Sequence, residues 1–185
     1  MKLAVGWFSL AVGIFLAFLL QQQIHAINGL NGARVLLVPM LFCYGALAMP
    51  TWAMLLLAAF TGFLTDLMYL NVAEGRVEIA LGWSMVYFVI FGLVAHGFQP
   101  GFQRGHWWLH PLLSAGGTIL FLALQYLMIT VRRQPFVFTF NDIVLWRILG
   151  PGLIAAVVAP FFYLAVYQSS QFFPGGRDRD YGERR

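Results

Sequence analysis

Long stretches without a charged side chain constrain this sequence more than any other feature. The 31 residues between Arg34 and Asp66 carry no charge, and residues 3–20 are also uncharged. Of the 185 residues, 61% are apolar and 10% are charged, whereas about 25% are charged in a typical soluble domain. So little polar surface cannot cover a globule in water, and we expect an integral membrane protein. A spanning helix takes about 20 residues. Several such helices and their connections use most of the 185 residues, which leaves no room for a separate soluble catalytic domain.

The alternation of apolar and polar stretches predicts six transmembrane helices in one all-α bundle. The first apolar stretch is longer than the core of a signal peptide, so we interpret it as an uncleaved span. Pro50 should divide residues 35–70 into two short helices with a tight turn at Met49–Thr51, because proline disfavours helix in the residue before it. The transmembrane domain is predicted over residues 1–171, and residues 172–185 form a charged, disordered cytoplasmic tail. The six predicted helices cover residues 3–22, 34–49, 51–69, 79–96, 109–131 and 143–168.

The basic residues set the predicted orientation, because cytoplasmic loops are enriched in lysine and arginine. With six spans both termini lie on one side, together with Lys2, Arg104 and the four arginines of the last nine residues. The other side carries five arginines. We therefore expect both termini in the cytoplasm. The net charge of +4 reflects this topology signal, and no nucleic-acid partner is expected.

Asp66 is the most unusual side chain in the apolar stretches, because a carboxylate deep in a bilayer costs about 2–3 kcal/mol. Three interpretations are open: a structural tether to nearby hydroxyls such as Thr65 or to an arginine, a contact with a partner protein, or an ion or proton site. Arg147 begins the last span and either snorkels to the interface or pairs with Asp142 or Asp66. In an up-and-down bundle Asp66 and Arg147 lie at the same depth, so an ion pair between them is predicted.

The sequence contains no recognisable catalytic or metal-binding motif. His106 and His110 have the spacing that can place two imidazoles on one helix face, but HWWLH lacks the glutamate of HExxH, and an interfacial position beside two tryptophans is the favoured interpretation. Cys43 lies in an apolar run and is expected to be a small buried side chain. A nucleophile elbow and a phosphate loop are also missing. We therefore predict no enzymatic activity, no cofactor and no metal.

Three stretches resemble the rod shape-determining protein MreD family. Residues 34–39 (RVLLVP) and the apolar run after them resemble the second helix of that family. Residues 58–67 (AAFTGFLTDL) resemble its Gly-x-x-x-Asp-Leu segment, and residues 147–160 resemble its last helix, which carries a late proline. After the aspartate the family often has Pro-Leu-Gly, of which Ala73-Glu74-Gly75 retains the glycine. The residues implied to be structural or partner-binding are Asp66, Arg147, Gly62, Pro39 and Pro160.

This resemblance implies a non-enzymatic scaffold in the bacterial inner membrane, within the cell-elongation (rod) complex that supports lateral peptidoglycan synthesis and cell shape. The implied partners are an MreC-like bitopic protein and, in the wider complex, MreB, RodA and a penicillin-binding transpeptidase. The family is also similar to the substrate-binding subunits of energy-coupling-factor transporters, so a vitamin-binding subunit is the alternative. Such a subunit needs several convergent polar groups, and the scarcity of polar side chains in the spans favours the scaffold.

Overall fold

Helices make up nearly all of the described chain. The structure, a computed structural model, describes residues 2–25, 32–69, 72–73, 76–77, 82–132 and 141–170. Its elements in chain order are α1 (Lys2–Gln23), α2 (Val38–Ala48), α3 (Thr51–Met68), the antiparallel strands β1 (Val72–Ala73) and β2 (Arg76–Val77), α4 (Trp83–Gly97), α5 (Gln99–Gln103), α6 (Leu109–Arg132) and α7 (Asp142–Ser170). Apart from the two-residue strands β1 and β2, the predicted all-α fold is confirmed for these residues.

Four helices are long and apolar enough to cross a membrane. These candidate spans are Ala4–Gln23, Thr51–Met68, Leu109–Val131 and Val144–Leu164. The remaining apolar helices, α2 and α4, have 11 and 15 residues. At a rise of 1.5 Å per residue α2 extends about 16 Å, whereas a bilayer core is about 30 Å thick. The described chain therefore has four candidate spans, and the predicted total of six stays a prediction.

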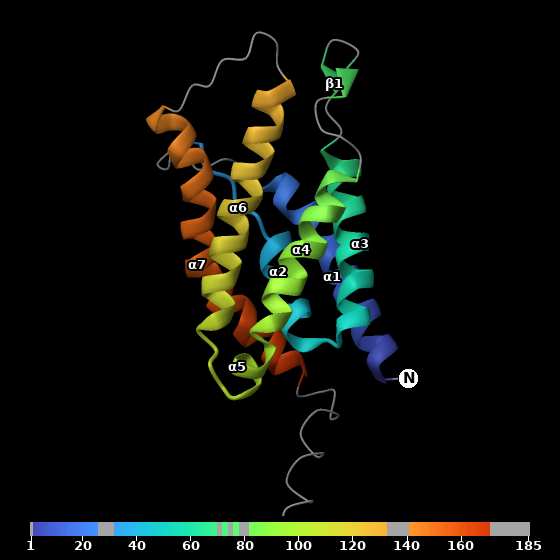
Figure 1. Cartoon of the computed structure of the whole chain (residues 1–185). Helices are drawn as coiled ribbons and strands as arrows, with labels where there is room; N and C mark the ends of the chain where they lie inside the picture. Colours follow the sequence, from blue (N-terminus) through green and yellow to red (C-terminus); the bar gives the residue numbers. More distant parts are fainter. Residues whose placement is uncertain are drawn as a thin grey trace, which may run out of the picture.

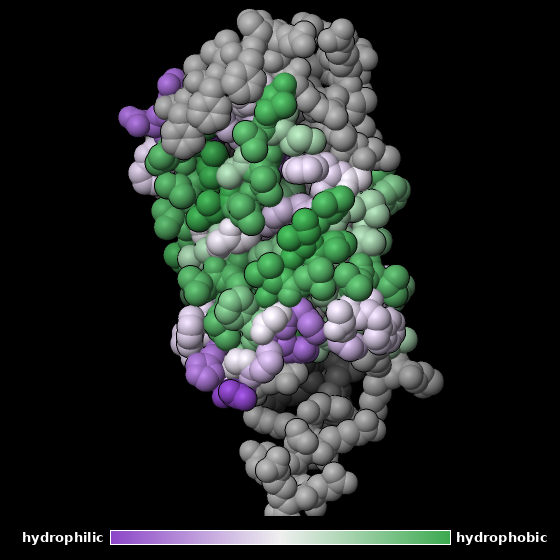
Figure 2. Space-filling view, viewed as in Figure 1, coloured by the Kyte–Doolittle hydropathy of each residue, from purple (hydrophilic) through white to green (hydrophobic). Residues whose placement is uncertain are grey.

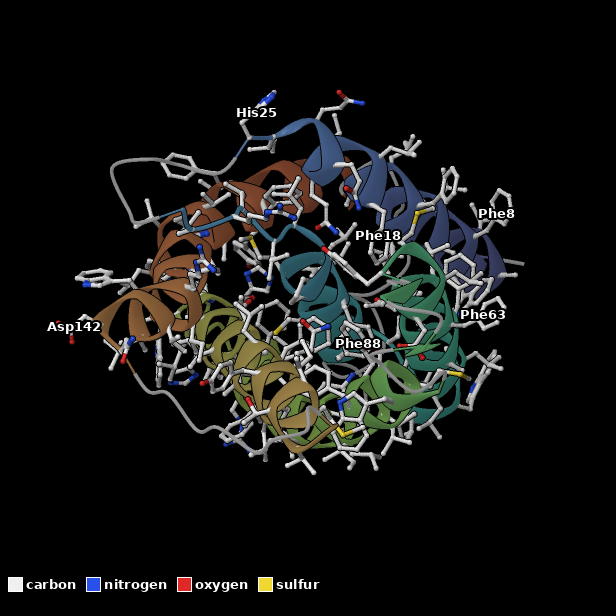
Figure 3. All side chains as sticks on the ribbon, turned by 90° about the horizontal axis from the view of Figure 1, so that it is seen from above. Phe8, Phe18, His25, Phe63, Phe88 and Asp142 are labelled. Carbon is white, nitrogen blue, oxygen red and sulfur yellow. The ribbon has the colours of Figure 1, made fainter. Side chains whose placement is uncertain are left out.

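The face of the bundle shown in Figure 2 is mostly apolar over its middle, with hydrophilic residues at the lower end and at the upper left. Large apolar side chains point outward on the long helices: Phe8, Val157 and Phe161 are 66%, 67% and 68% exposed. Seen along the bundle, Phe8 and Phe63 project from its rim, whereas Phe88 lies inside the ring of helices (Figure 3). Such a surface requires a lipid environment, which supports a multi-pass membrane protein.

The short helix α2 occupies the centre of the bundle (Figure 3) and contacts all the other helices of the described chain. It begins at Val38, four residues later than predicted, with Pro39 in its first turn. A helix that began at residue 34 would place this proline in the interior, where its missing N–H and its ring disrupt the preceding turn. Residues 34–37 are therefore non-helical. Because α2 is enclosed by other helices, it need not match the bilayer thickness.

The predicted turn between α2 and α3 is confirmed. Met49 and Pro50 adopt extended conformations between the end of α2 and the start of α3. Side chains from the end of α4 stabilise this corner: the His96 ring lies 3.2 Å from the Ala46 carbonyl and 2.9 Å from the Thr51 hydroxyl. The Gln99 amide, from α5, donates to the Met49 carbonyl at 3.2 Å. These groups satisfy carbonyls that the end of a helix leaves without an intrahelical partner.

The core between α2, α4 and α6 is filled by aromatic side chains. Phe42 and Phe88 pack edge to face with ring centroids 5.0 Å apart, and Tyr87 lies 4.9 Å from Phe121. Within a membrane, the association of helices depends on such close packing more than on hydrophobic burial. The N-terminus and the end of α7 lie at the same end of this bundle (Figure 1).

Candidate functional site

Asp66 lies at the end of α3 and holds the start of α4. Its carboxylate accepts hydrogen bonds from the backbone N–H groups of Gly82, at 2.6 Å, and Ser84, at 3.3 Å. Only 5% of the residue is exposed. The first N–H groups of a helix have no intrahelical acceptor, and this end of a helix carries a partial positive charge. A buried carboxylate is therefore stabilised here without a cation, and Asp66 links α3 to α4 as a tether.

Gly62 allows this tether to form, because it lies one helical turn before Asp66 on the face that meets α4. A Cβ atom at position 62 would collide with the backbone of Ser84 and Met85. A backbone cannot move aside as the end of a flexible side chain can, so the two helices approach this closely only if residue 62 is glycine. Small residues at such positions are typical of closely packed membrane helices, and Gly62 is in that position here.

Two predicted partners of Asp66 are wrong. The hydroxyls of Thr61 and Thr65 donate to the carbonyls of Leu57 and Thr61, each at 2.7 Å, as threonines in apolar helices commonly do. Among the described residues no ion pair joins Asp66 to Arg147, and the carboxylate accepts hydrogen bonds from the amides of Gly82 and Ser84 instead. The rival Asp142–Arg147 ion pair is likewise not formed among these residues, and both side chains are exposed.

Arg147 instead borders a cavity of about 430 Å³, together with a second arginine, Arg34. The cavity lies between the segment before α2, the end of α3, α6 and the first turns of α7. Tyr69, the residue directly after α3, contributes a hydroxyl group, and Leu36, Leu122 and Pro151 contribute apolar walls. The sequence does not predict this cavity, because Arg34 and Arg147 are 113 residues apart and only the tertiary structure brings them to one opening.

Gln21 holds two walls of this cavity in place. Its amide donates to the Tyr69 hydroxyl oxygen at 3.3 Å, and its carbonyl oxygen accepts from the backbone N–H of Leu37, also at 3.3 Å. Burial raises the pKa of the Tyr69 hydroxyl, and the positive charge of Arg34 opposes this rise. Tyr69 therefore stays a neutral hydrogen-bond donor at neutral pH.

The other singled-out residues have separate environments. Pro39 is buried in the first turn of α2, and Pro160 lies inside α7, far along the chain from Asp66. His110 is 1% exposed, with its Nε2 atom 3.1 Å from the Met40 carbonyl. His106 is exposed, and its Nδ1 atom lies 3.1 Å from the Gly101 carbonyl. The two histidines thus contact different backbone carbonyls and do not converge on one point.

Comparison of the chain with family models, with curated proteins and with solved structures gives no match. The family resemblance of residues 34–39, 58–67 and 147–160 therefore remains an expectation from the sequence, and the function is argued from the geometry of the molecule.

Proposed function

We propose that this protein is a non-enzymatic membrane scaffold of the MreD type, which supports bacterial cell elongation by binding other membrane proteins. The observation that carries the proposal is the use of Gly62 and Asp66. These are the most distinctive residues of the segment that resembles the family, and both serve the packing of α3 on α4. Both residues contact the backbone of α4 within the same protein. Such internal contacts are expected where a rigid binding surface must be maintained.

The interior of the bundle supports the same role. Its centre is filled by the rings of Phe42, Phe88 and Phe121 and their neighbours, and each oxygen of the Asp66 carboxylate accepts from a backbone amide. A membrane enzyme needs at least two reactive groups that converge on a substrate. A scaffold instead needs a stable outer surface. The inner-membrane location and the partners, above all an MreC-like bitopic protein, are part of this proposal.

A second candidate function is a solute-binding subunit of an energy-coupling-factor-type transporter. One observation favours it: the cavity of about 430 Å³ beside Arg34 and Arg147 has the size of a small-molecule site. The cavity lies toward one end of the bundle and has few polar groups, which fits a vitamin less well than it fits the amphipathic ligand considered below.

Affinity purification of the full chain in a mild detergent distinguishes the two functions. Co-purification of the wall-synthesis proteins named above is expected, and co-purification of an ATPase module instead would reject the scaffold. The functional counterpart is deletion with complementation, scored by cell width. His106→Ala and His110→Ala should restore normal width if the protein still inserts. Loss of rod shape with unchanged partner association would contradict a purely structural role.

A further inference from the structure

The opening of the cavity carries two positive charges. Arg34 and Arg147 both border it, and both side chains are exposed. Asp66 and Asp142 are the two carboxylates of the described chain, and neither is paired with these guanidinium groups. Residues 26–31 and 133–140, the loops that precede Arg34 and Arg147 in the sequence, contain no aspartate or glutamate. The cavity therefore attracts an anion.

Arg147 lies inside the membrane-spanning part of α7. It is the fourth residue of the candidate span Val144–Leu164, which places it near the boundary between headgroups and hydrocarbon. A cation at this depth is costly unless it is neutralised by a partner or reaches the headgroups. An anion held at the opening supplies that partner.

The far end of the cavity is apolar and lies deeper in the membrane. Leu122 precedes the end of α6 at Arg132 by ten residues, which corresponds to about 15 Å along the helix. Pro151 is nine residues into α7, at a similar depth of about 14 Å. The cavity thus changes from cationic at the membrane boundary to apolar inside, which is the polarity profile of a lipid molecule and not of a free phosphate ion.

We propose that this cavity binds one anionic phospholipid, with the headgroup phosphate between Arg34 and Arg147 and an acyl chain along Leu122 and Pro151. Guanidinium groups form paired hydrogen bonds with phosphate oxygens. Tyr69 accepts its bond from Gln21 through the phenol oxygen, so the phenol hydrogen remains for donation to the headgroup. This site is independent of the scaffold role proposed above.

Native mass spectrometry of the detergent-purified full chain, titrated with dioleoyl phosphatidylglycerol, tests the proposal. One saturable adduct is expected, and its affinity should exceed that of dioleoyl phosphatidylcholine, which has the same acyl chains and no net charge, by at least about five-fold. Millimolar inorganic phosphate should not displace the lipid. Equal binding of the two lipids, or displacement by inorganic phosphate, would overturn the proposal, the latter by identifying a site for soluble anions.

Charge-removing variants locate the site. Arg34→Gln and Arg147→Gln should each weaken phosphatidylglycerol binding about five-fold, whereas Arg34→Lys and Arg147→Lys should retain most of it. Arg104→Gln is the matched control, because Arg104 is an exposed arginine directly after α5, which lies at the opposite end of the bundle from the start of α7 (Figure 1). An equal loss in Arg104→Gln would overturn the assignment. Since the wild-type comparison of two lipids needs no variant, the proposal stays testable even if a substitution prevents folding.

The glutamates that follow Tyr69 in the sequence provide a further check. Glu74 and Glu78 lie outside the described residues, and the double variant Glu74→Gln/Glu78→Gln removes both charges. Unchanged phosphatidylglycerol affinity is expected. A gain of more than about five-fold would identify these carboxylates as the natural counter-ions of Arg34 and Arg147, and would overturn the lipid assignment.

Discussion

Single residues at the α3–α4 junction have separable physical roles. Gly62 provides space for the backbone of α4, whereas Asp66 provides acceptors for its first amides. At the start of α4, Gly82 has a positive φ of 94°, a conformation that side-chain-bearing residues rarely adopt. These three positions are therefore the most sensitive to substitution at this contact.

We predict that Gly62→Ala lowers the stability of the bundle by about 1–2 kcal/mol, because the new methyl group meets backbone atoms that cannot give way. Thermal unfolding in detergent measures the loss. Gly116→Ala is the control, since no atom lies within 4 Å of a Cβ at that helical position. It should be neutral or stabilising by up to about 1 kcal/mol. Equal losses in both variants would contradict the close-approach argument.

We predict that Asp66→Asn also destabilises the bundle, by about 1–2 kcal/mol. The asparagine side chain keeps one acceptor but turns an NH₂ group toward the N–H groups of α4. Asp142→Asn removes an exposed carboxylate at the start of α7, and its effect should stay below about 0.5 kcal/mol. The same unfolding assay applies, and an Asp66→Asn variant as stable as Asp142→Asn would show that the tether contributes little.

Pairs of elements divide the bundle into two closely packed units. The most extensive contacts are between α3 and α4 and between α6 and α7, and α2 lies between the two pairs. Asp66 belongs to the first pair and Arg147 to the second. The sequence had predicted an ion pair that closes the bundle between them, but the structure places Asp66 on its neighbour α4 and Arg147 at the cavity opening.

A double-mutant cycle on Asp66→Asn and Arg147→Gln tests this separation of elements. Because the two side chains share no partner, we expect their effects on thermal stability to add within about 0.3–0.5 kcal/mol. The cycle is measured in a detergent without added lipid, so that a bound headgroup does not link the two sites. A coupling energy above about 1 kcal/mol would support a direct ion pair between Asp66 and Arg147.

The face of the molecule shown in Figure 2 is mostly apolar, and the first helix starts at the end of the bundle where the last helix finishes (Figure 1). This arrangement predicts that the start of α1 and the end of α7 face the same side of a membrane. The arginine count adds the expectation that this side is the cytoplasm.

We predict cytoplasmic termini, which reporter fusions can measure. A fusion at residue 185 should give a cytoplasmic signal, and a fusion within residues 132–142 should give a periplasmic one. Reversed signals at both positions would show that the protein has the opposite orientation in the membrane. A periplasmic signal at residue 185 together with a cytoplasmic N-terminus would require an odd number of spans.

Local sequence patterns were sufficient for the membrane class and for the turn at Pro50. Each of these depends on properties of a short stretch: the absence of charge and the missing N–H of proline. The late start of α2 also follows from Pro39, although the apolar run had suggested an earlier one.

Tertiary structure alone decided the partners of the polar groups. Asp66 binds amides 16 and 18 residues further along the chain, Gln21 joins Leu37 to Tyr69, and His96 reaches back to Thr51 and Ala46. Most of these partners are backbone groups, which every residue carries, so the sequence holds no pattern that identifies them. The cavity between Arg34 and Arg147 arises for the same reason, because the distance between two side chains depends on how the helices pack and not on the residues next to them.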